Sequence, residues 1–214
     1  MLDALVMTLG FEPGPLVSAV ASAAARGFSE GARIVVLTAA FPDERVERAW
    51  LQFQTVVGMM ELCKRLSIEM EKREVPLGDM ALAILNVKRI FEELAERSVR
   101  VSITGGMRAL GLAVFIACLL TRWRREPEIE VYLEGRGAAL EVPSVRRLLT
   151  AAEKCGDVVR IMRTGKVWKL NELAVRLGRD RSTVYRKMKL LREAGAVRKV
   201  RGGYELTVLG MLLS

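Results

Sequence analysis

The sequence VSITGGMRAL, residues 101–110, contains the end of a strand, a turn and the start of a helix. Its β-branched residues predict a strand that ends at Gly105-Gly106, and an apolar pattern with helical spacing begins directly afterwards. One interpretation is a tight strand-to-helix turn with a surface arginine. The other is a ligand-binding loop, because glycines and the N–H groups of a helix N-terminus let an anion approach the backbone. Thr104 would then add a hydroxyl group and Arg108 a positive charge.

The rest of residues 1–143 repeats this alternation of strand and helix. Apolar or β-branched runs predict strands at residues 2–8, 32–38, 68–75, 99–104, 128–135 and 137–142, the last two around a turn at Gly135-Arg136-Gly137. Amphipathic segments between the strands predict helices, with Asp43 and Asp79 as candidate N-caps. The predicted fold class is therefore α/β, an open and mostly parallel sheet with helices on both faces.

The two loops that follow the first and fourth predicted strands are candidates for a ligand site. Open parallel sheets bind ligands outside the carboxyl ends of their strands, where the strand order reverses. The two loops are TLGFEPG, residues 8–14, and TGGMR, residues 104–108. The sequence has no GxxxxGK[ST] motif, and no GxGxxG follows the first strand, so neither a Walker A loop nor a dinucleotide-binding fingerprint is predicted.

Residues 144–214 are strongly basic. They contain 17 Lys and Arg against 6 Asp and Glu, whereas residues 1–143 contain 17 and 19, respectively. An excess of this size indicates a polyanionic partner. The sequence pattern predicts helices at residues 151–165, 169–178 and 182–195, then a hairpin of residues 197–200 and 204–207 around Arg201-Gly202-Gly203. This order, with a short turn before the third helix, is that of a winged helix-turn-helix domain, which binds double-stranded DNA.

The third helix of this segment has one apolar face and one polar face. Val184, Met188 and Leu191 share a face and are expected in the core. The residues expected to contact DNA are Arg181, Ser182, Thr183, Tyr185, Arg186 and Lys189 on the helix, and Arg198, Lys199 and Arg201 on the wing. Arginine reads guanine in the major groove, and wing charges contact phosphates or the minor groove. The alternative is a solvated basic helix in a subdomain that mediates protein contacts.

Several classes of function are excluded by composition. The sequence has no histidine, which excludes Ser-His-Asp and Cys-His catalysis and most zinc enzymes. Cys63, Cys118 and Cys155 lie in apolar helical patterns without CxxC spacing, so buried thiols are expected. The N-terminus lacks a basic n-region, and the apolar run at residues 110–121 is too short to span a bilayer. We therefore expect a soluble, cytoplasmic protein with no catalytic residues, metal, cofactor or membrane partner.

The chain resembles the CRISPR-associated transcriptional regulators of archaea that join a CARF domain to a winged helix. That family carries T-x-G-F after its first strand, matched by residues 8–11, and [ST]-G-G-[MT]-[KR] after its fourth, matched by residues 104–108. The resemblance covers essentially the whole chain. It implies a Rossmann-like CARF domain for ligand sensing and dimerisation at residues 1–143 and a winged helix-turn-helix domain at residues 144–214. At Ser102 the chain departs from the family, which often has Asn or Asp there.

The resemblance also implies a ligand, a partner and a role. CARF domains pair as homodimers and bind cyclic oligoadenylates across the two-fold axis, and for this subgroup cyclic tetra-adenylate is the expected regulatory ligand. The implied ligand-binding residues are Thr8, Leu9, Gly10, Phe11, Thr104, Gly105, Gly106, Met107 and Arg108. The regulated genes would belong to CRISPR antiviral defence. Two alternatives stay open: a ring nuclease that cleaves cyclic tetra-adenylate without a metal, and a one-component regulator that senses another nucleotide.

Overall fold

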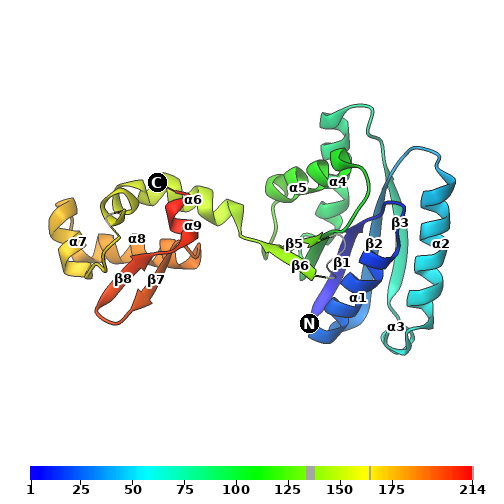
Figure 1. The fold of residues 1–214 in the computed structure, drawn as a ribbon, viewed down its shortest axis with the longest axis horizontal. Coiled ribbons are helices and arrows are strands. Elements are labelled where there is room, and N and C mark those ends of the chain that lie inside the picture. Colours follow the sequence, from blue (N-terminus) through cyan, green and yellow to red (C-terminus); the bar gives the residue numbers. More distant parts are fainter. Residues whose placement is uncertain (134–137, 164, 214) are drawn as a thin grey trace. The chain divides into compact units, whose positions relative to one another are not determined.

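The computed structural model describes residues 1–133, 138–163 and 165–213 of the chain (Figure 1). The chain divides into two compact units, Met1–Pro143 and Ser144–Ser214. The turn predicted at residues 135–137 lies outside the described residues. In the described part of the chain, no helix is long and apolar enough to cross a membrane.

The first unit is an α/β sheet domain. Its elements are β1 (Leu2–Thr8), α1 (Gly14–Arg26), β2 (Phe28–Ala39), α2 (Glu44–Met59), α3 (Glu61–Arg65), β3 (Glu69–Val75), α4 (Met80–Leu94), β4 (Val99–Ile103), α5 (Arg108–Leu120), β5 (Glu128–Leu133) and β6 (Ala138–Val142). Within the described residues, six strands form one sheet in the order β3-β2-β1-β4-β5-β6. Neighbours from β3 to β5 pair in parallel, and β6 pairs antiparallel with β5. The predicted fold class is confirmed.

Helices cover both faces of this sheet (Figure 1). Because side chains alternate along a strand, Leu5 and Met7 of β1 pack with α1 and α2, whereas Ala4 and Val6 pack with α4 and α5. Burial on both faces explains why the central strands read as continuous apolar runs. The apolar run at residues 110–121 forms most of α5 and supplies five buried side chains, so its hydrophobicity is that of a helix packed into the core.

The segment 41–66, predicted as one helical pattern, forms two helices. Met60 is extended (φ −66°, ψ 119°) and separates α2 from α3. This break redirects the chain so that Cys63 packs into the core on the α1 and α2 side. Asp43 and Asp79 each accept a hydrogen bond of 2.9 Å from a backbone N–H in the following helical turn. Both N-cap predictions are therefore confirmed.

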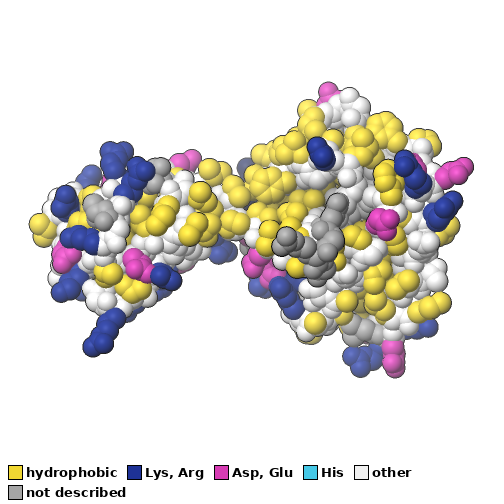
Figure 2. Space-filling view, viewed as in Figure 1, with side chains coloured by type: hydrophobic (Ala, Val, Ile, Leu, Met, Phe, Trp, Pro, Cys, Tyr) yellow, Lys and Arg dark blue, Asp and Glu magenta, His cyan; other side chains and the backbone are white. Residues whose placement is uncertain are grey.

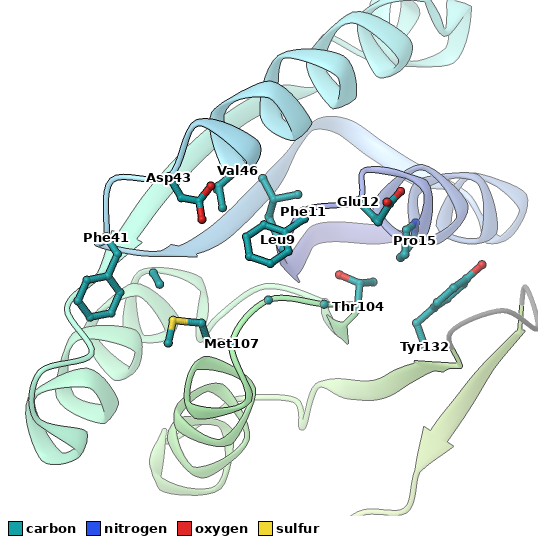
Figure 3. Close-up of a pocket in the computed structure, with 14 residues that line it drawn as sticks. Leu9, Phe11, Glu12, Pro15, Phe41, Asp43, Val46, Thr104, Met107 and Tyr132 are labelled. Atoms are coloured by element: carbon teal, nitrogen blue, oxygen red, sulfur yellow. The ribbon is translucent and has the colours of Figure 1, made fainter.

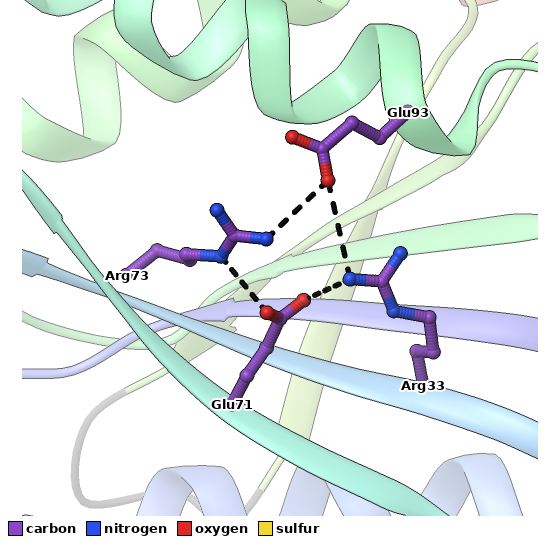
Figure 4. Close-up of polar contacts among 4 residues, drawn as sticks. All are labelled: Arg33, Glu71, Arg73 and Glu93. Atoms are coloured by element: carbon purple, nitrogen blue, oxygen red, sulfur yellow. Dashed lines mark hydrogen bonds and ion pairs between the residues drawn. The ribbon is translucent and has the colours of Figure 1, made fainter.

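Ion pairs hold the edge strand β3 to its neighbours. Glu71 accepts hydrogen bonds from the guanidinium groups of Arg33 on β2 and Arg73 on β3. The same two arginines lie 4.0 and 3.4 Å from Glu93 of α4, which closes a ring of four charges (Figure 4). On the opposite face Lys72 forms an ion pair of 2.5 Å with α2. Strand β3 is thus attached to both helical layers by charged side chains.

The second unit has the order of a winged helix-turn-helix domain. Its elements are α6 (Val145–Met162), α7 (Leu170–Leu177), α8 (Arg181–Glu193), β7 (Val197–Val200), β8 (Gly203–Leu206) and α9 (Val208–Met211). Strands β7 and β8 pair as the wing, and Trp168 adds a short bridge to Tyr204. Val184, Met188 and Leu191 are buried, as predicted. The sequence did not predict α9, and β8 ends one residue early because Thr207 is the N-cap of that helix.

The three cysteines are free and buried, which confirms the prediction of buried thiols. Burial raises the pKa of the Cys63 and Cys155 thiols, and it raises that of Cys118 to above its usual range. The raised pKa values keep all three thiols protonated at neutral pH. Because the thiolate is the reactive form, these side chains are unreactive there.

Candidate ligand pocket and DNA-binding surface

The strand order reverses between β1 and β4, and the loops that follow these strands touch. Thr8 Oγ1 accepts hydrogen bonds from the backbone N–H groups of Thr104 (3.1 Å) and Gly105 (3.3 Å). In return Thr104 Oγ1 donates to the carbonyl oxygen of Thr8 at 2.5 Å. Both threonine side chains are buried. The first threonine of each signature therefore joins the two loops through hydrogen bonds.

Two of the signature glycines are required by this close packing. A Cβ on Gly10 would lie 2.6 Å from the backbone nitrogen of Gly106, which is too close for any real Cβ contact. A Cβ on Gly106 would lie 2.8 Å from the Leu9 carbonyl oxygen, and Gly106 also has φ +90°. Gly105 differs, because its nearest neighbour to a Cβ is Gly10 N at 3.6 Å. Packing of the loops thus explains Gly10 and Gly106 but not Gly105.

A pocket of about 620 Å³ opens beside these loops (Figure 3). Seven of the nine predicted ligand-binding residues line it: Leu9, Gly10, Phe11, Thr104, Gly105, Gly106 and Met107. Thr8 lies beneath the loops, and Arg108 is exposed at the start of α5 but is not among the lining residues. A ligand contact by any of the nine residues stays a prediction.

The two signature loops form only part of the pocket, and the sequence did not predict the rest of its lining. The carboxyl end of β2 contributes Ala39, the segment that follows it contributes Phe41 and Asp43, and β5 contributes Tyr132. In Figure 3 the ring of Phe11 lies between Phe41 on one side and Tyr132 on the other. The strand order could have indicated this part of the pocket. Because β2 runs parallel to β1, its carboxyl end reaches the same edge of the sheet.

Two helices that begin at the pocket lack a side-chain cap. No side-chain hydrogen bond caps α1 at Pro13 or α5 at Met107, whereas aspartates cap α2, α4 and α8. The first N–H groups of α1 and α5 therefore have no side-chain acceptor in the described residues. Together with the helix dipole, such groups attract anions.

The aspartate that caps α2 also binds a nearby arginine. Asp43 Oδ1 accepts from Arg45 Nε at 3.0 Å, and Asp43 Oδ2 accepts from Arg45 Nη2 at 2.8 Å. The guanidinium carbon of Arg45 lies 3.9 Å from the ring centroid of Phe11, a cation–π distance. Hydrogen bonding between the two groups lowers the pKa of Asp43 and raises that of Arg45, so both stay charged.

In the second unit, the polar face of α8 is exposed. Arg181, Ser182, Tyr185, Arg186 and Lys189 are exposed, and Thr183 is half-buried. All three predicted wing residues, Arg198, Lys199 and Arg201, are exposed as well. On the face of this unit that Figure 2 shows, dark blue Lys and Arg side chains outnumber magenta Asp and Glu side chains. The structure thus brings the predicted DNA-contact residues together on one helix and one hairpin.

Part of this polar face is occupied by contacts within the protein. Asp180, the N-cap of α8, accepts hydrogen bonds from the hydroxyl groups of Ser182 (2.6 Å) and Thr183 (2.7 Å) and from the Thr183 N–H (2.8 Å). These bonds hold the pKa of Asp180 well below its usual range. Arg198 pairs with Glu205 on the wing. Within the described residues, the positive charges of Arg181 and Lys199 have no such partner.

Comparison with known proteins agrees with this architecture. A family model described as the Csa3 CRISPR-associated Rossmann-like domain matches residues 3–143, and a model described as an HTH domain matches residues 157–205. The fold together with these two matches defines a CRISPR-associated, DNA-binding regulator that joins a Rossmann-like domain to a winged helix-turn-helix. The chain belongs to the Csa3 family. A search of curated proteins found no match to it.

Proposed function

We propose that this protein is a transcriptional regulator of CRISPR-Cas genes whose DNA binding responds to cyclic tetra-adenylate. The observation that carries the proposal is the pocket, because seven signature residues line it in a chain that also has a winged helix-turn-helix. Aromatic side chains there provide surfaces on which a base can stack. The uncapped starts of α1 and α5 attract phosphates.

The active species is a homodimer. A ring of four phosphates has two-fold symmetry that matches two identical copies of the pocket loops. The same symmetry gives two recognition helices, so the operator is a near-palindrome with half-sites about one helical turn apart. Ligand binding shifts the dimer between arrangements that differ in operator affinity, by an amount set by its differential affinity for them.

Calorimetry tests the ligand. Cyclic tetra-adenylate is compared with AMP, NAD and linear oligoadenylates on the same protein. Tight binding of the cyclic species alone supports the proposal. Equal or tighter binding of AMP or NAD instead identifies a regulator that senses another nucleotide.

Gel-shift titration on promoters of neighbouring CRISPR genes tests the DNA partner. The expected result is a preference for one promoter over random DNA, changed in strength by cyclic tetra-adenylate. No preference over random DNA, with and without the ligand, contradicts the regulator.

The proposed role is sensing rather than cleavage, with no cofactor or metal involved. A ring nuclease would use Thr104 to position the reacting groups, but the Thr104 hydroxyl is buried and donates to the Thr8 carbonyl oxygen. Incubation with radiolabelled cyclic tetra-adenylate checks this point. The ligand is expected intact after hours, and linear products would identify an enzyme.

A further inference from the structure

Arg45 carries a positive charge beside the ligand pocket, and it lies in neither signature loop. It occupies the first turn of α2, next to the N-cap Asp43. Its guanidinium group is held on one side by the carboxylate of Asp43 and rests on the ring of Phe11. Both of these neighbours line the pocket.

The charges that line the pocket make this position important for an anionic ligand. Among the described residues, the charged side chains that line the pocket are Glu12 and Asp43, and both are acidic. Arg45 neutralises Asp43 through two hydrogen bonds. Glu12, on the first loop, has no ion pair within the part of the chain that the structure describes. Glu12, Asp43 and Arg45 together carry a formal charge of −1, and without Arg45 this charge would be −2 and would repel a phosphate more strongly.

The geometry of Arg45 leaves it able to bind a further anion. A guanidinium group has five N–H donors, of which the bonds to Asp43 use one on Nε and one on Nη2. The side chain is 66% exposed and touches Asp43 and Phe11, two residues that line the pocket, so its remaining donors are open to solvent beside the pocket. Because the carboxylate and the ring already fix its orientation, binding an anion costs Arg45 little additional rotamer entropy.

We propose that Arg45 is an anion-binding residue of this pocket. It contacts a phosphate of a nucleotide whose base lies against the aromatic side chains that line the pocket. Asp43 and Phe11 position its guanidinium group. The inference rests on the proposed function for the identity of the nucleotide, cyclic tetra-adenylate. It adds a cation from the first turn of α2 to a site that the two signature loops otherwise supply with anion-binding groups.

The test compares Arg45→Gln with Arg48→Gln. Arg48 lies three residues further along α2 and is exposed, and neither a hydrogen bond nor a cation–π contact joins it to a pocket-lining residue within the described part of the chain, so the control changes the net charge equally. Calorimetry with cyclic tetra-adenylate is expected to show about tenfold weaker binding for Arg45→Gln and less than about a twofold change for Arg48→Gln. Salt should weaken ligand binding less steeply in Arg45→Gln than in the other proteins.

Arg45→Lys separates charge from packing. This variant keeps the positive charge but loses the planar contact with Phe11 and the paired hydrogen bonds to Asp43. It should recover part of the lost affinity and the salt dependence of the unmodified protein. Unchanged affinity in Arg45→Gln, or a loss with unchanged salt dependence, overturns the inference. Circular dichroism of each variant checks that α2 and the fold are retained.

The outcomes also separate this inference from the proposed function. If the unmodified protein binds AMP but not cyclic tetra-adenylate, the proposed function fails, and the same variants are compared with AMP. A loss in Arg45→Gln then still supports an anion-binding arginine. If the unmodified protein binds none of cyclic tetra-adenylate, AMP and inorganic pyrophosphate, both the proposed function and this inference are wrong.

Discussion

Gly105 and Gly106 are adjacent but have different physical reasons to be glycine. Gly106 has φ +90°, and a Cβ there would lie 2.8 Å from the Leu9 carbonyl oxygen. Gly106→Ala should therefore lower the free energy of unfolding by about 1–3 kcal/mol. Gly105→Ala should change it by less than about 0.5 kcal/mol but place a methyl group at the pocket and weaken ligand binding. Urea denaturation and calorimetry measure the two effects, and equal destabilisation by both variants contradicts this assignment.

Arg186 and Lys199 are expected to contribute to DNA binding in different ways. Arg186 is exposed on α8, and its Nη2 donates to Thr183 Oγ1 at 3.1 Å, whereas Lys199 is exposed on the wing strand β7. Arg186→Ala should lose about 1–3 kcal/mol of discrimination between operator and mutated operator. Lys199→Ala should weaken binding to all sequences and reduce the salt slope by about 1. Titrations at several salt concentrations test this, and identical behaviour of the two variants contradicts it.

At the scale of elements, the N-terminus of α8 combines a cap with an unfavourable charge. Asp180 caps the helix, but its negative charge lies beside residues expected to approach DNA phosphates. Asp180→Asn should retain the cap and bind random DNA more tightly, because asparagine is also a favourable N-cap residue. Asp180→Ala should lower the urea midpoint. A midpoint lowered equally in both variants shows that the charge, not the cap, stabilises the helix.

The stabilisation by Asp180 should also depend on pH. The pKa of Asp180 is lower in the folded protein than its usual value, because hydroxyl and N–H groups donate to the ionised carboxylate. The stabilisation is therefore fully present above the unfolded pKa, about 3.9, and is lost as pH falls through the folded pKa. The difference in urea midpoint between the unmodified protein and Asp180→Ala should accordingly shrink in acid. A difference as large at pH 2 as at neutral pH contradicts this source.

Charged side chains contribute to the stability of strand β3, in addition to the apolar contacts of Met70 and Val75. Glu71 interacts with Arg33 and Arg73, and its side chain is 28% exposed. Glu71→Gln should lower the free energy of unfolding by about 1 kcal/mol, and less at high salt. Glu69→Gln is the matched control, since Glu69 is exposed on the same strand without an ion pair in the described residues. Denaturation at two salt concentrations measures both, and equal effects contradict a stabilising ring.

These elements also explain which features the sequence could predict. Buried central strands and capped helices carry their own signals, so β1, β4 and the caps at Asp43 and Asp79 were predicted correctly. Strand β3 gave a weak signal because its polar side chains are satisfied by partners far away in the sequence. The pocket wall at Phe41 was missed for the same reason, since only the strand order brings it beside the signature loops. Local sequence patterns predict local structure, whereas the part of the pocket outside the signature loops is formed by tertiary contacts.

At the scale of the whole molecule, charge is divided between two units that each have a core. Residues 144–214 contain 17 Lys and Arg against 6 Asp and Glu, and residues 1–143 contain 17 against 19. Each unit also buries its own apolar cluster or clusters. We therefore expect the two segments to fold when expressed separately. Residues 144–214 should then bind DNA, and residues 1–143 should bind the ligand.

Isolated residues 144–214 should bind random duplex DNA with a Kd of about 10⁻⁴–10⁻⁶ M at physiological salt, and isolated residues 1–143 should not bind it. Isolated residues 1–143 should bind cyclic tetra-adenylate in the absence of DNA. The preference for the operator should be much weaker in isolated residues 144–214 than in the full chain. Helix-turn-helix dimers obtain specificity from two recognition helices held at a fixed spacing. Fluorescence titration of both segments and the full chain measures this. Operator binding as tight by residues 144–214 alone as by the full chain would contradict a role of the proposed dimer in recognition.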